Sequence, residues 1–450
     1  MSKPTPISGF PEWLPPQRMI ELHVLDRLRS TFELYGFAPL ETRSVEPLDQ
    51  LLRKGETSKE VYLLRRLQDD AGADVGADAL GLHFDLTVPF ARFVLENAGK
   101  LQFPFRRYQI QKVWRGERPQ EGRYREFLQA DIDIVDRDTL PFHYEVELPL
   151  VIGDALGGLP LGQPDGELPV VIQVNNRKLC EGFYRGLGIE DAEGALRVID
   201  KLDKIGPDRV AAALSETVGA SDAQARACLA LAQIGAADAS FVDQVRALGV
   251  DDPMLDEGLA ELAAVVEAAG RYAPGLCRAE LKIARGLDYY TGTVYETQLR
   301  GFERAGSICS GGRYDNLATA GADRFPGVGL SIGVSRMLGL LFGAGVLTVS
   351  RQVPTAVLVA LPDEERRADC DQVAAALRAR GIATEVAPGA QKYGKQIRFA
   401  ERRGIPFVWF PGGDGEPDTV KDIRSGDQAE AFAATWAPPA VDLRPQVHGG

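Results

Sequence analysis

Apolar residues near the start of the chain recur with the period of an α-helix. Between residues 17 and 36 the apolar positions follow one another at intervals of three or four: Met19, Leu22, Leu25, Leu28, Phe32 and Tyr35. Gly36 follows them as a stop signal. The pattern therefore predicts an amphipathic helix over 17–36.

Strand-like patterns come after this helix. Residues 39–47 and 82–98 have strand character, and the second stretch turns helical after Pro89. Polar and apolar residues alternate over 105–114 and over 126–135, which predicts two strands joined by a loop.

The strand predicted at 126–135 has one polar face. Gln129, Asp131 and Asp133 fall on the same side of its two-residue repeat, and apolar residues fall on the other side. One face of a sheet is therefore polar, and we interpret it as a candidate floor for a substrate.

The amino-acid composition and the predicted secondary structure change twice in the second half of the chain. From about 175 to 270 it is rich in alanine, leucine and charged residues, which predicts a mostly helical insertion. Strand character returns over 281–299 and is followed by a glycine-dense stretch at 307–317. Residues 325–344 are typical of a glycine-rich strand that leads into an apolar helix.

A boundary is predicted near 345–353, where Pro354 follows a polar stretch. Beyond it strand and helix patterns alternate, which predicts a separate α/β domain with mostly parallel strands. We expect the last dozen residues to be frayed. The expected organisation is an α+β core with a mixed, mainly antiparallel sheet, interrupted by the helical insertion and followed by the α/β domain. Its segments are 1–170 (core, first part), 171–272 (insertion), 273–345 (core, second part) and 354–446 (α/β domain).

Composition restricts the class of protein. Hydrophobic residues make up 45% of the chain and charged residues 26%, which is ordinary for a soluble globular protein. No run approaches ~18 consecutive apolar residues, and the N-terminal residues have no apolar signal core, so we expect neither a membrane span nor secretion. The five cysteines are far apart and form no C-x-x-C pair. This favours a cytoplasmic protein without disulfides or a bound zinc.

Charge is distributed unevenly. The net charge of −13 argues against a general nucleic-acid coat or a membrane-surface protein. Residues 106–125, however, carry seven Arg or Lys and only two Glu. The arginines of the loop between the two predicted strands suit phosphate oxygens, which indicates a polyphosphate ligand. The alternative is a solvated loop balanced by Glu117 and Glu121, with Phe127 in the core instead of against a base.

Two further stretches carry candidate chemistry. Residues 284–296 place Arg285, an aspartate and two tyrosines close together, beside a glycine that permits close backbone approach. The tyrosines could equally be half-buried strand aromatics. Residues 310–317 and 327–337 contain glycines at spacings that suit either a ligand or tight strand packing. Arg336, at the start of an apolar helix, favours an anionic partner.

Taken together, these motifs resemble one family. VWRGERPQEGRYREFLQADIDIVD (113–136) resembles the second signature motif of class II aminoacyl-tRNA synthetases, and GVGLSIGVSRM (327–337) resembles the third. RGLDYYTGTVYE (285–296) resembles the peptide peculiar to histidyl-tRNA synthetases, together with FDLTVPFAR (84–92) and GGRYDNL (311–317). The resemblance extends from about residue 10 to the end of the chain.

The resemblance implies a ligase that activates L-histidine with ATP and transfers it to the 3′ end of tRNA(His). It implies a homodimer with a catalytic core of the class II fold, a C-terminal anticodon-binding domain, ATP as substrate and Mg²⁺ accompanying it. The main rival is a non-catalytic regulatory subunit of histidine biosynthesis that resembles the synthetase core. A class II synthetase for threonine, proline or glycine is a second rival. An RNA-binding protein without catalysis would not need the two phosphate-holding arginine motifs.

The resemblance also implies residue roles. The α-ammonium group of histidine would meet Asp85 and Thr87 beside Gln129, and its imidazole nitrogens would meet Asp133 and Tyr290, in a pocket also lined by Tyr289 and Tyr314. Arg115 and Arg285 would be catalytic and flank the α-phosphate and the attacking carboxylate. The rest of ATP would contact Glu117, Arg123, Phe127 and Arg336.

This sequence departs from the family pattern twice. Arg43 stands where the first motif usually has a proline, which affects the geometry of the dimer interface expected around 38–60. Ser335 precedes Arg336 where an acidic residue is common.

Overall fold

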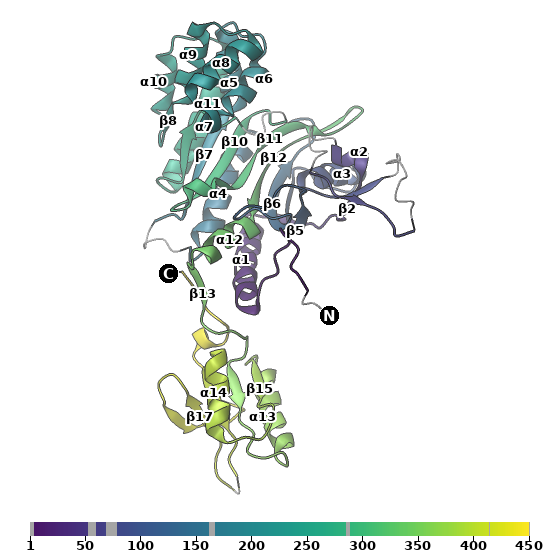
Figure 1. Ribbon diagram of the computed structural model, residues 1–450, viewed down its shortest axis with the longest axis vertical. Helices are drawn as coiled ribbons and strands as arrows, with labels where there is room; N and C mark the ends of the chain where they lie inside the picture. Colours follow the sequence, from purple (N-terminus) through teal and green to yellow (C-terminus); the bar gives the residue numbers. More distant parts are fainter. Residues whose placement is uncertain are drawn as a thin grey trace. The chain divides into compact units, whose positions relative to one another are not determined.

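The computed structural model describes residues 4–52, 60–68, 79–161, 167–284, 289–413 and 415–449 (Figure 1). Its internal contacts group into two compact units. The first contains Met1–Pro11, Leu25–Leu159 and Gln163–Gly343, and the second contains Glu12–Val24, Pro160–Gly162 and Ala344–Gly450. Each unit is described by itself below.

The first unit is built on a nine-stranded sheet with the order β1-β5-β6-β12-β11-β10-β7-β9-β8. The pairs from β5 to β7 are antiparallel, whereas β1 pairs with β5 and β7 with β9 in parallel. The mixed, mainly antiparallel sheet expected from the sequence is therefore confirmed. Its strands are β1 (Ala38–Pro39), β5 (Phe105–Trp114), β6 (Glu126–Val135), β7 (Val170–Asn176), β8 (Gly235–Ala236), β9 (Cys277–Glu280), β10 (Thr293–Leu299), β11 (Ser307–Ala320) and β12 (Asp323–Gly333).

The helices that pack on this sheet include α3 (Thr87–Asn97), α4 (His143–Gly157), α12 (Val334–Gly343) and the part of α1 (Pro15–Leu34) from Leu25 onward. The apolar stripe of α1 is buried at Leu25, Leu28 and Phe32, as its period predicts, whereas Leu22 is 44% exposed. The ring of Phe32 packs against Phe37 and Tyr108. On α3, Phe90 and Val94 pack against Phe325 of β12. These contacts fix α3 against the strands that carry the polar face.

The stretch 82–98 differs from its prediction at its start. Only Leu80–Leu82 is a strand, β4, and the helix begins at Thr87 instead of after Pro89. The reason is local, because Asp85 Oδ1 accepts the backbone N–H of Val88 at 3.0 Å and supplies an N-terminal hydrogen bond that the helix itself lacks. Pro89 then lies in the first turn, where its missing N–H costs nothing.

The insertion consists mainly of helices: α5 (Arg177–Gly186), α6 (Ala192–Ile199), α7 (Leu202–Ile205), α8 (Pro207–Val218), α9 (Asp222–Ala232), α10 (Phe241–Arg246) and α11 (Pro253–Tyr272). Asp252 caps α11 through the N–H groups of Met254 and Leu255. Glycines let α11 approach α5 closely, since a Cβ at Gly182 would lie 2.2 Å from the nitrogen of Leu255.

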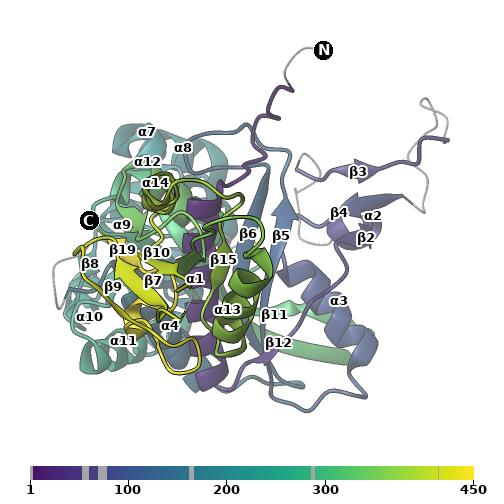
Figure 2. The same cartoon turned by 90° about the horizontal axis from the view of Figure 1, so that it is seen from below.

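A small sheet of β2 (Val45–Pro47), β4 (Leu80–Leu82) and β3 (Leu63–Leu64), with helix α2 (Leu48–Leu51), stands apart from the insertion. In both views the two lie at opposite ends of the main sheet (Figures 1 and 2). Residues 53–59, which belong to the expected dimer surface, lie outside the described residues.

The second unit confirms the predicted alternation. Strands β14 (Val357–Val359), β15 (Thr384–Val386) and β16 (Phe407–Phe410) are parallel and alternate with α13 (Arg367–Ala379) and α14 (Tyr393–Arg403). Two antiparallel strands, β17 (Thr419–Asp422) and β18 (Gln428–Glu430), extend the sheet. The core centres on Trp409, whose Nε1 donates to Asp418 Oδ2 at 2.9 Å.

The expectation of a frayed C-terminal tail is wrong. Residues Val447–Gly449 form β19, which pairs with β13 (Leu347–Val349) in an antiparallel ladder. Just before β19, the backbone oxygen of Asp442 accepts a hydrogen bond from the buried guanidinium of Arg351 at 2.8 Å. The proline-rich composition of the tail suggested fraying, but main-chain pairing of this kind needs only the N–H and C=O groups of the last few residues.

All five cysteines are free and buried. Burial raises the pKa of Cys180, Cys277 and Cys309 to about 12 in each case. Within the described residues, no helix is both long and apolar enough to span a membrane. Nor do those residues contain a group of three or more metal-binding side chains.

Candidate active site

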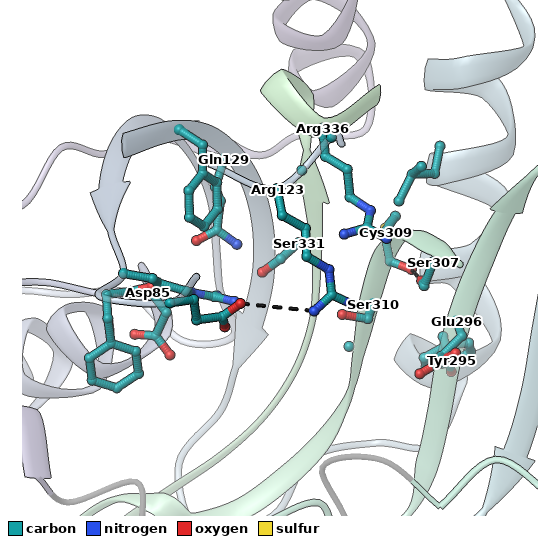
Figure 3. Close-up of a pocket in the computed structure, with 18 of the residues that line it drawn as sticks. Asp85, Arg123, Gln129, Tyr295, Glu296, Ser307, Cys309, Ser310, Ser331 and Arg336 are labelled. Carbon is teal, nitrogen blue, oxygen red and sulfur yellow. Dashed lines mark hydrogen bonds and ion pairs between the residues drawn. The ribbon is translucent and has the colours of Figure 1, made fainter. Parts of the chain in front are cut away.

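Two adjoining cavities open on the polar face of β6 and β12. Their volumes are about 580 Å³ and about 150 Å³. Asp85, Arg115, Gln129, Tyr289 and Tyr290 line both, so the two cavities form one continuous site. Figure 3 shows Asp85, Gln129, Ser331 and Arg336 around the larger cavity.

The smaller cavity is built around Asp133 of β6. Its Oδ1 accepts the hydroxyl of Tyr314 at 2.7 Å, and its Oδ2 lies 2.7 Å from Nη2 of Arg107. Gly329 faces Asp133 in register on β12, and a Cβ there would lie 2.0 Å from Oδ1. The carboxylate is thus oriented by two partners, and the glycine leaves the space that it occupies.

Arg107 is itself fully buried. Its Nη2 also donates to the backbone oxygen of Leu86 at 3.2 Å, and its guanidinium carbon lies 4.3 Å from the ring centre of Phe90. No role for Arg107 was expected from the sequence. The pattern contained a signal, however, because Arg107, Gln109 and Gln111 continue the polar face of β6 onto β5.

Tyr289 and Tyr290 precede β10, and their ring centres lie 4.0 Å apart. The backbone next to them is held by hydrogen bonds. Arg177 Nη1 donates to the oxygen of Tyr290 at 3.3 Å, and Thr291 Oγ1 donates to Asp315 Oδ2 at 2.8 Å. The two rings therefore stand on a fixed segment at the junction of the cavities. The expected strand begins only at Thr293.

The larger cavity gathers cations from separate elements. Arg115 directly follows β5 and donates its Nε–H to the backbone oxygen of Phe84 at 2.9 Å. Its guanidinium carbon lies 5.1 Å from the ring centre of Phe127. Nη1 of Arg123 lies 3.9 Å from Oε2 of Glu117 within the same loop. Arg336 opens α12, as expected, and donates to the backbone oxygen of Ala305.

Each predicted site residue that the structure describes lines at least one of the two cavities. Thr87, Asp133 and Tyr314 line the smaller one, and Glu117, Arg123, Phe127 and Arg336 the larger one, in addition to the five predicted residues that line both. Arg285 lies outside the described residues. Residues that the sequence did not single out also line the larger cavity: Glu60, Tyr124, Glu296, Ser307, Cys309, Ser310 and Ser331. Their side chains are of types that occur throughout the chain, so no pattern distinguished them.

The chemistry of this site is electrostatic. The smaller cavity is polar and is lined by carboxylates, and the larger cavity next to it is lined by three arginines. Arg115 lines both cavities. Cys309 is a poor nucleophile, because burial holds its pKa near 12. His83 lines neither cavity; it is buried, stacks on Trp114 and has its pKa lowered by burial. Such a site suits an amine-bearing ligand beside a polyphosphate.

Comparison with known proteins identifies the family. Residues 9–337 match the family model described as "Histidyl-tRNA synthetase". This chain belongs to the histidyl-tRNA synthetase family. Residues 346–431 match a second model, "Anticodon binding domain". The chain is therefore a class II aminoacyl-tRNA synthetase, as the sequence motifs indicated.

Relatives within the family match over their whole length. The chain is 59% identical to a "Histidine--tRNA ligase" of Cutibacterium acnes, with 100% of both chains covered. It is also 59% identical to a "Histidine--tRNA ligase" of Micrococcus luteus, with 99% of both covered. Among solved structures, the histidyl-tRNA synthetase of Nostoc superimposes with a TM-score of 0.84 at 34% identity and covers 96% of this chain and 97% of its own. These matches favour the ligase over a regulatory subunit.

Proposed function

We propose that the chain couples L-histidine to ATP, forming histidyl-adenylate and pyrophosphate, and then transfers the histidyl group to the 3′ end of tRNA(His). The observation that carries this proposal is the pair of joined cavities with Arg115 at their junction. One cavity suits an amino acid with a polar side chain, and the other suits a triphosphate.

Histidine occupies the smaller cavity. Its α-ammonium group lies near Asp85, Thr87 and Gln129, which line that cavity together. Asp133 and Tyr290 pair with the imidazole nitrogens, and Tyr289 and Tyr314 enclose the ring. The support for Asp133 is its fixed orientation by Tyr314 and Arg107, since a preoriented acceptor discriminates strongly against side chains without an N–H group.

ATP occupies the larger cavity. Arg115 meets the α-phosphate, and Glu117, Arg123, Phe127 and Arg336 contact the rest of the nucleotide. The role of Arg285 beside the α-phosphate rests on the family resemblance. Glu117 and Glu296 also line this cavity and fit the one or two carboxylates that commonly meet the Mg²⁺ of a nucleotide. When bound, that ion neutralises phosphate charge. We expect no protein-bound zinc.

The first step needs no general base, because the carboxylate of histidine is already ionised at neutral pH. It attacks the α-phosphorus, and the bond from that phosphorus to the leaving pyrophosphate oxygen breaks. The chain's own contribution is to align the two ligands and to place arginines where negative charge develops. The absence of a nucleophilic or basic triad from the described lining residues agrees with this mechanism.

We propose that the protein is a cytoplasmic homodimer. Leu63, Leu64 and Leu80, on the small sheet next to the expected interface, are between 42% and 45% exposed. Exposed leucines on neighbouring short strands suit a second copy of this chain.

Pyrophosphate exchange tests the assignment directly. With ATP and Mg²⁺, L-histidine is expected to stimulate exchange of labelled pyrophosphate into ATP, and the other nineteen standard amino acids are not. The pairing of Asp133 with an imidazole nitrogen is the physical reason. Comparable exchange with threonine, proline or glycine would contradict the proposal, and so would no exchange with any amino acid.

The second unit is proposed to bind the anticodon of tRNA(His). A cavity of about 390 Å³ between α14 and the loop before it is lined by Lys395, Arg398, Arg402 and Phe399. Basic side chains can bind the phosphates of an RNA, and an aromatic ring can stack on a base. This combination is typical of sites that contact single-stranded RNA.

Reversing the charge of three of these residues should distinguish the adenylation step from the transfer to tRNA. The variant Lys395→Glu/Arg398→Glu/Arg402→Glu is expected to lower tRNA charging at least tenfold and to leave histidine-dependent exchange unchanged. The cause is lost phosphate contact, so charging by the wild type should also weaken with added salt. Arg444→Glu, at an exposed position of the same unit, serves as the control for added negative charge. Equal loss of exchange and charging in a folded variant would contradict the division of labour.

A further inference from the structure

Asp131 is a buried carboxyl group that the proposed reaction does not use. It lies on β6 between Gln129 and Asp133, so its side chain is on the face of the sheet that forms the site. The residue has no solvent exposure, and neither Oδ1 nor Oδ2 has a hydrogen bond of normal length and angle among the described residues. The hydroxyl of Ser331, in register on β12, is the polar neighbour that favours the ionised form. An ionised carboxylate without partners is costly to bury, and a protonated one is far less so.

The residue opposite Asp131 has an unsatisfied acceptor. Gln109 pairs with Asp131 in register on β5. Its Nε2 donates to Thr42 Oγ1 at 2.9 Å and to Gln111 Oε1 at 2.7 Å, while its own buried Oε1 has no partner in the described structure. Directly opposed residues on one face have adjacent side chains. A proton on Asp131 would supply the donor that Gln109 Oε1 lacks.

The surrounding charges also favour a protonated group. The buried cation on the neighbouring strand, Arg107, lies 2.7 Å from Asp133 and is engaged there. Burial is the largest influence on Asp131 and raises its pKa to about 7; Arg107 lowers the pKa, and the carboxylates of Asp133 and Asp85 raise it. The charged or titratable groups that act on Asp131, or that it acts on, are Arg107 of β5, Asp133 of β6, Cys309 of β11, Asp85 before α3 and Tyr289 before β10. The uncharged hydroxyl of Ser331 on β12 lowers the pKa by hydrogen bonding.

We propose that Asp131 is a positioning residue that carries a proton in the empty site and releases it when the α-ammonium group of histidine enters. The inference rests on the proposed function, because it requires that group to lie near Asp85 and Gln129. On binding, the O–H bond of the carboxyl group breaks, the proton passes to the buffer, and the carboxylate remains. The empty site thereby avoids a third carboxylate charge beside those of Asp133 and Asp85, and the occupied site gains a counter-charge for the ammonium group.

The direction of the pH dependence follows from this exchange. At pH values below 7, Asp131 is mostly protonated in the free protein, so histidine must displace the proton in order to bind. The contribution of Asp131 to affinity is therefore present above pH 7 and is lost as the pH falls. With a pKa of about 7 in the free protein, the release is about 0.9 proton per site at pH 6, about 0.5 at pH 7 and about 0.1 at pH 8.

Isothermal titration calorimetry tests this count. Histidine is titrated into the full-length protein at each pH in buffers of different ionisation enthalpy, which gives the number of protons released. Histidine titrates its own imidazole in this range, so the quantity compared is the difference between the wild type and Asp131→Asn. The asparagine keeps the shape and can still donate to Gln109. Its titration should lack the release assigned to Asp131, while it still binds histidine.

Glu126→Gln is the matched control, since it makes the same chemical change on the same strand. Burial raises the pKa of Glu126, but hydrogen bonds from Lys112 and Trp114 outweigh burial and lower it overall. This variant should therefore release as many protons as the wild type. Equal release by Asp131→Asn and the wild type would overturn the inference. Failure of the wild type to bind histidine would instead overturn the proposed function.

A second measurement covers the case in which Asp131→Asn does not fold. The infrared spectrum of the wild type at pH 6 should contain the carbonyl band of a buried protonated carboxyl group. Adding histidine should remove that band, with the appearance of a carboxylate band. Binding of histidine without any loss of the band would equally overturn the inference.

Discussion

Replacing Arg115 with alanine is expected to lower the rate of histidine-dependent pyrophosphate exchange by about two to three orders of magnitude, the usual effect of deleting one partner of the transition-state charge. Arg115 is the arginine that lines both cavities, and its guanidinium is held by the backbone oxygen of Phe84 and by the ring of Phe127. The loss should appear in kcat more than in the KM for histidine, because the charge that Arg115 neutralises develops during the reaction.

Two variants make this result specific. Arg115→Lys keeps the charge but loses the planar fork, so its exchange rate should fall between those of the wild type and Arg115→Ala. Arg118→Ala removes an exposed arginine of the same loop and should exchange at nearly the wild-type rate. A folded Arg115→Ala protein with normal exchange would exclude Arg115 from the reaction.

Replacing Asp133 with asparagine is expected to damage both the fold and the site. The change leaves the buried guanidinium of Arg107 without its counter-charge at 2.7 Å, which typically costs about 3–5 kcal/mol of unfolding free energy. It also replaces an acceptor of the imidazole N–H with a group of different charge. Histidine-dependent exchange should therefore fall at least about 100-fold at saturating ATP. Urea denaturation and exchange assays measure the two losses separately.

A double variant separates stability from recognition. In Arg107→Met/Asp133→Asn, no buried charge is left unpaired, so most of the lost stability should return. Exchange should stay low, because the carboxylate for the imidazole is still missing. If the double variant regains wild-type exchange, Asp133 stabilises the fold and does not recognise histidine. If Asp133→Asn alone is as stable as the wild type, the ion pair with Arg107 does not contribute to the stability of the fold.

Elements with strong local patterns were predictable. The strands expected at 105–114 and 126–135 coincide with β5 and β6, and the helix expected at 17–36 is α1, Pro15–Leu34. Alternation and helical period are local properties, and here the tertiary contacts agree with them. The apolar face of the predicted strand is indeed buried, and its polar face lines the site.

What the sequence did not reveal depends on contacts between distant segments. The role of Arg107 exists only because β5 and β6 place it opposite Asp133. The strand β19 forms because its backbone pairs with β13, which lies about one hundred positions earlier in the chain. The family motifs, by contrast, named a set of residues from five separate stretches, and those that the structure describes meet in one place.

The burial of every native thiol makes this enzyme suited to site-specific labelling. Maleimide and similar reagents attack exposed thiolates, and the five cysteines are buried, with raised pKa values. A cysteine introduced at the exposed position of Arg118 would therefore react far faster than any native one. A fluorophore attached there would report movement of the loop between β5 and β6 during turnover, with all native cysteines left in place.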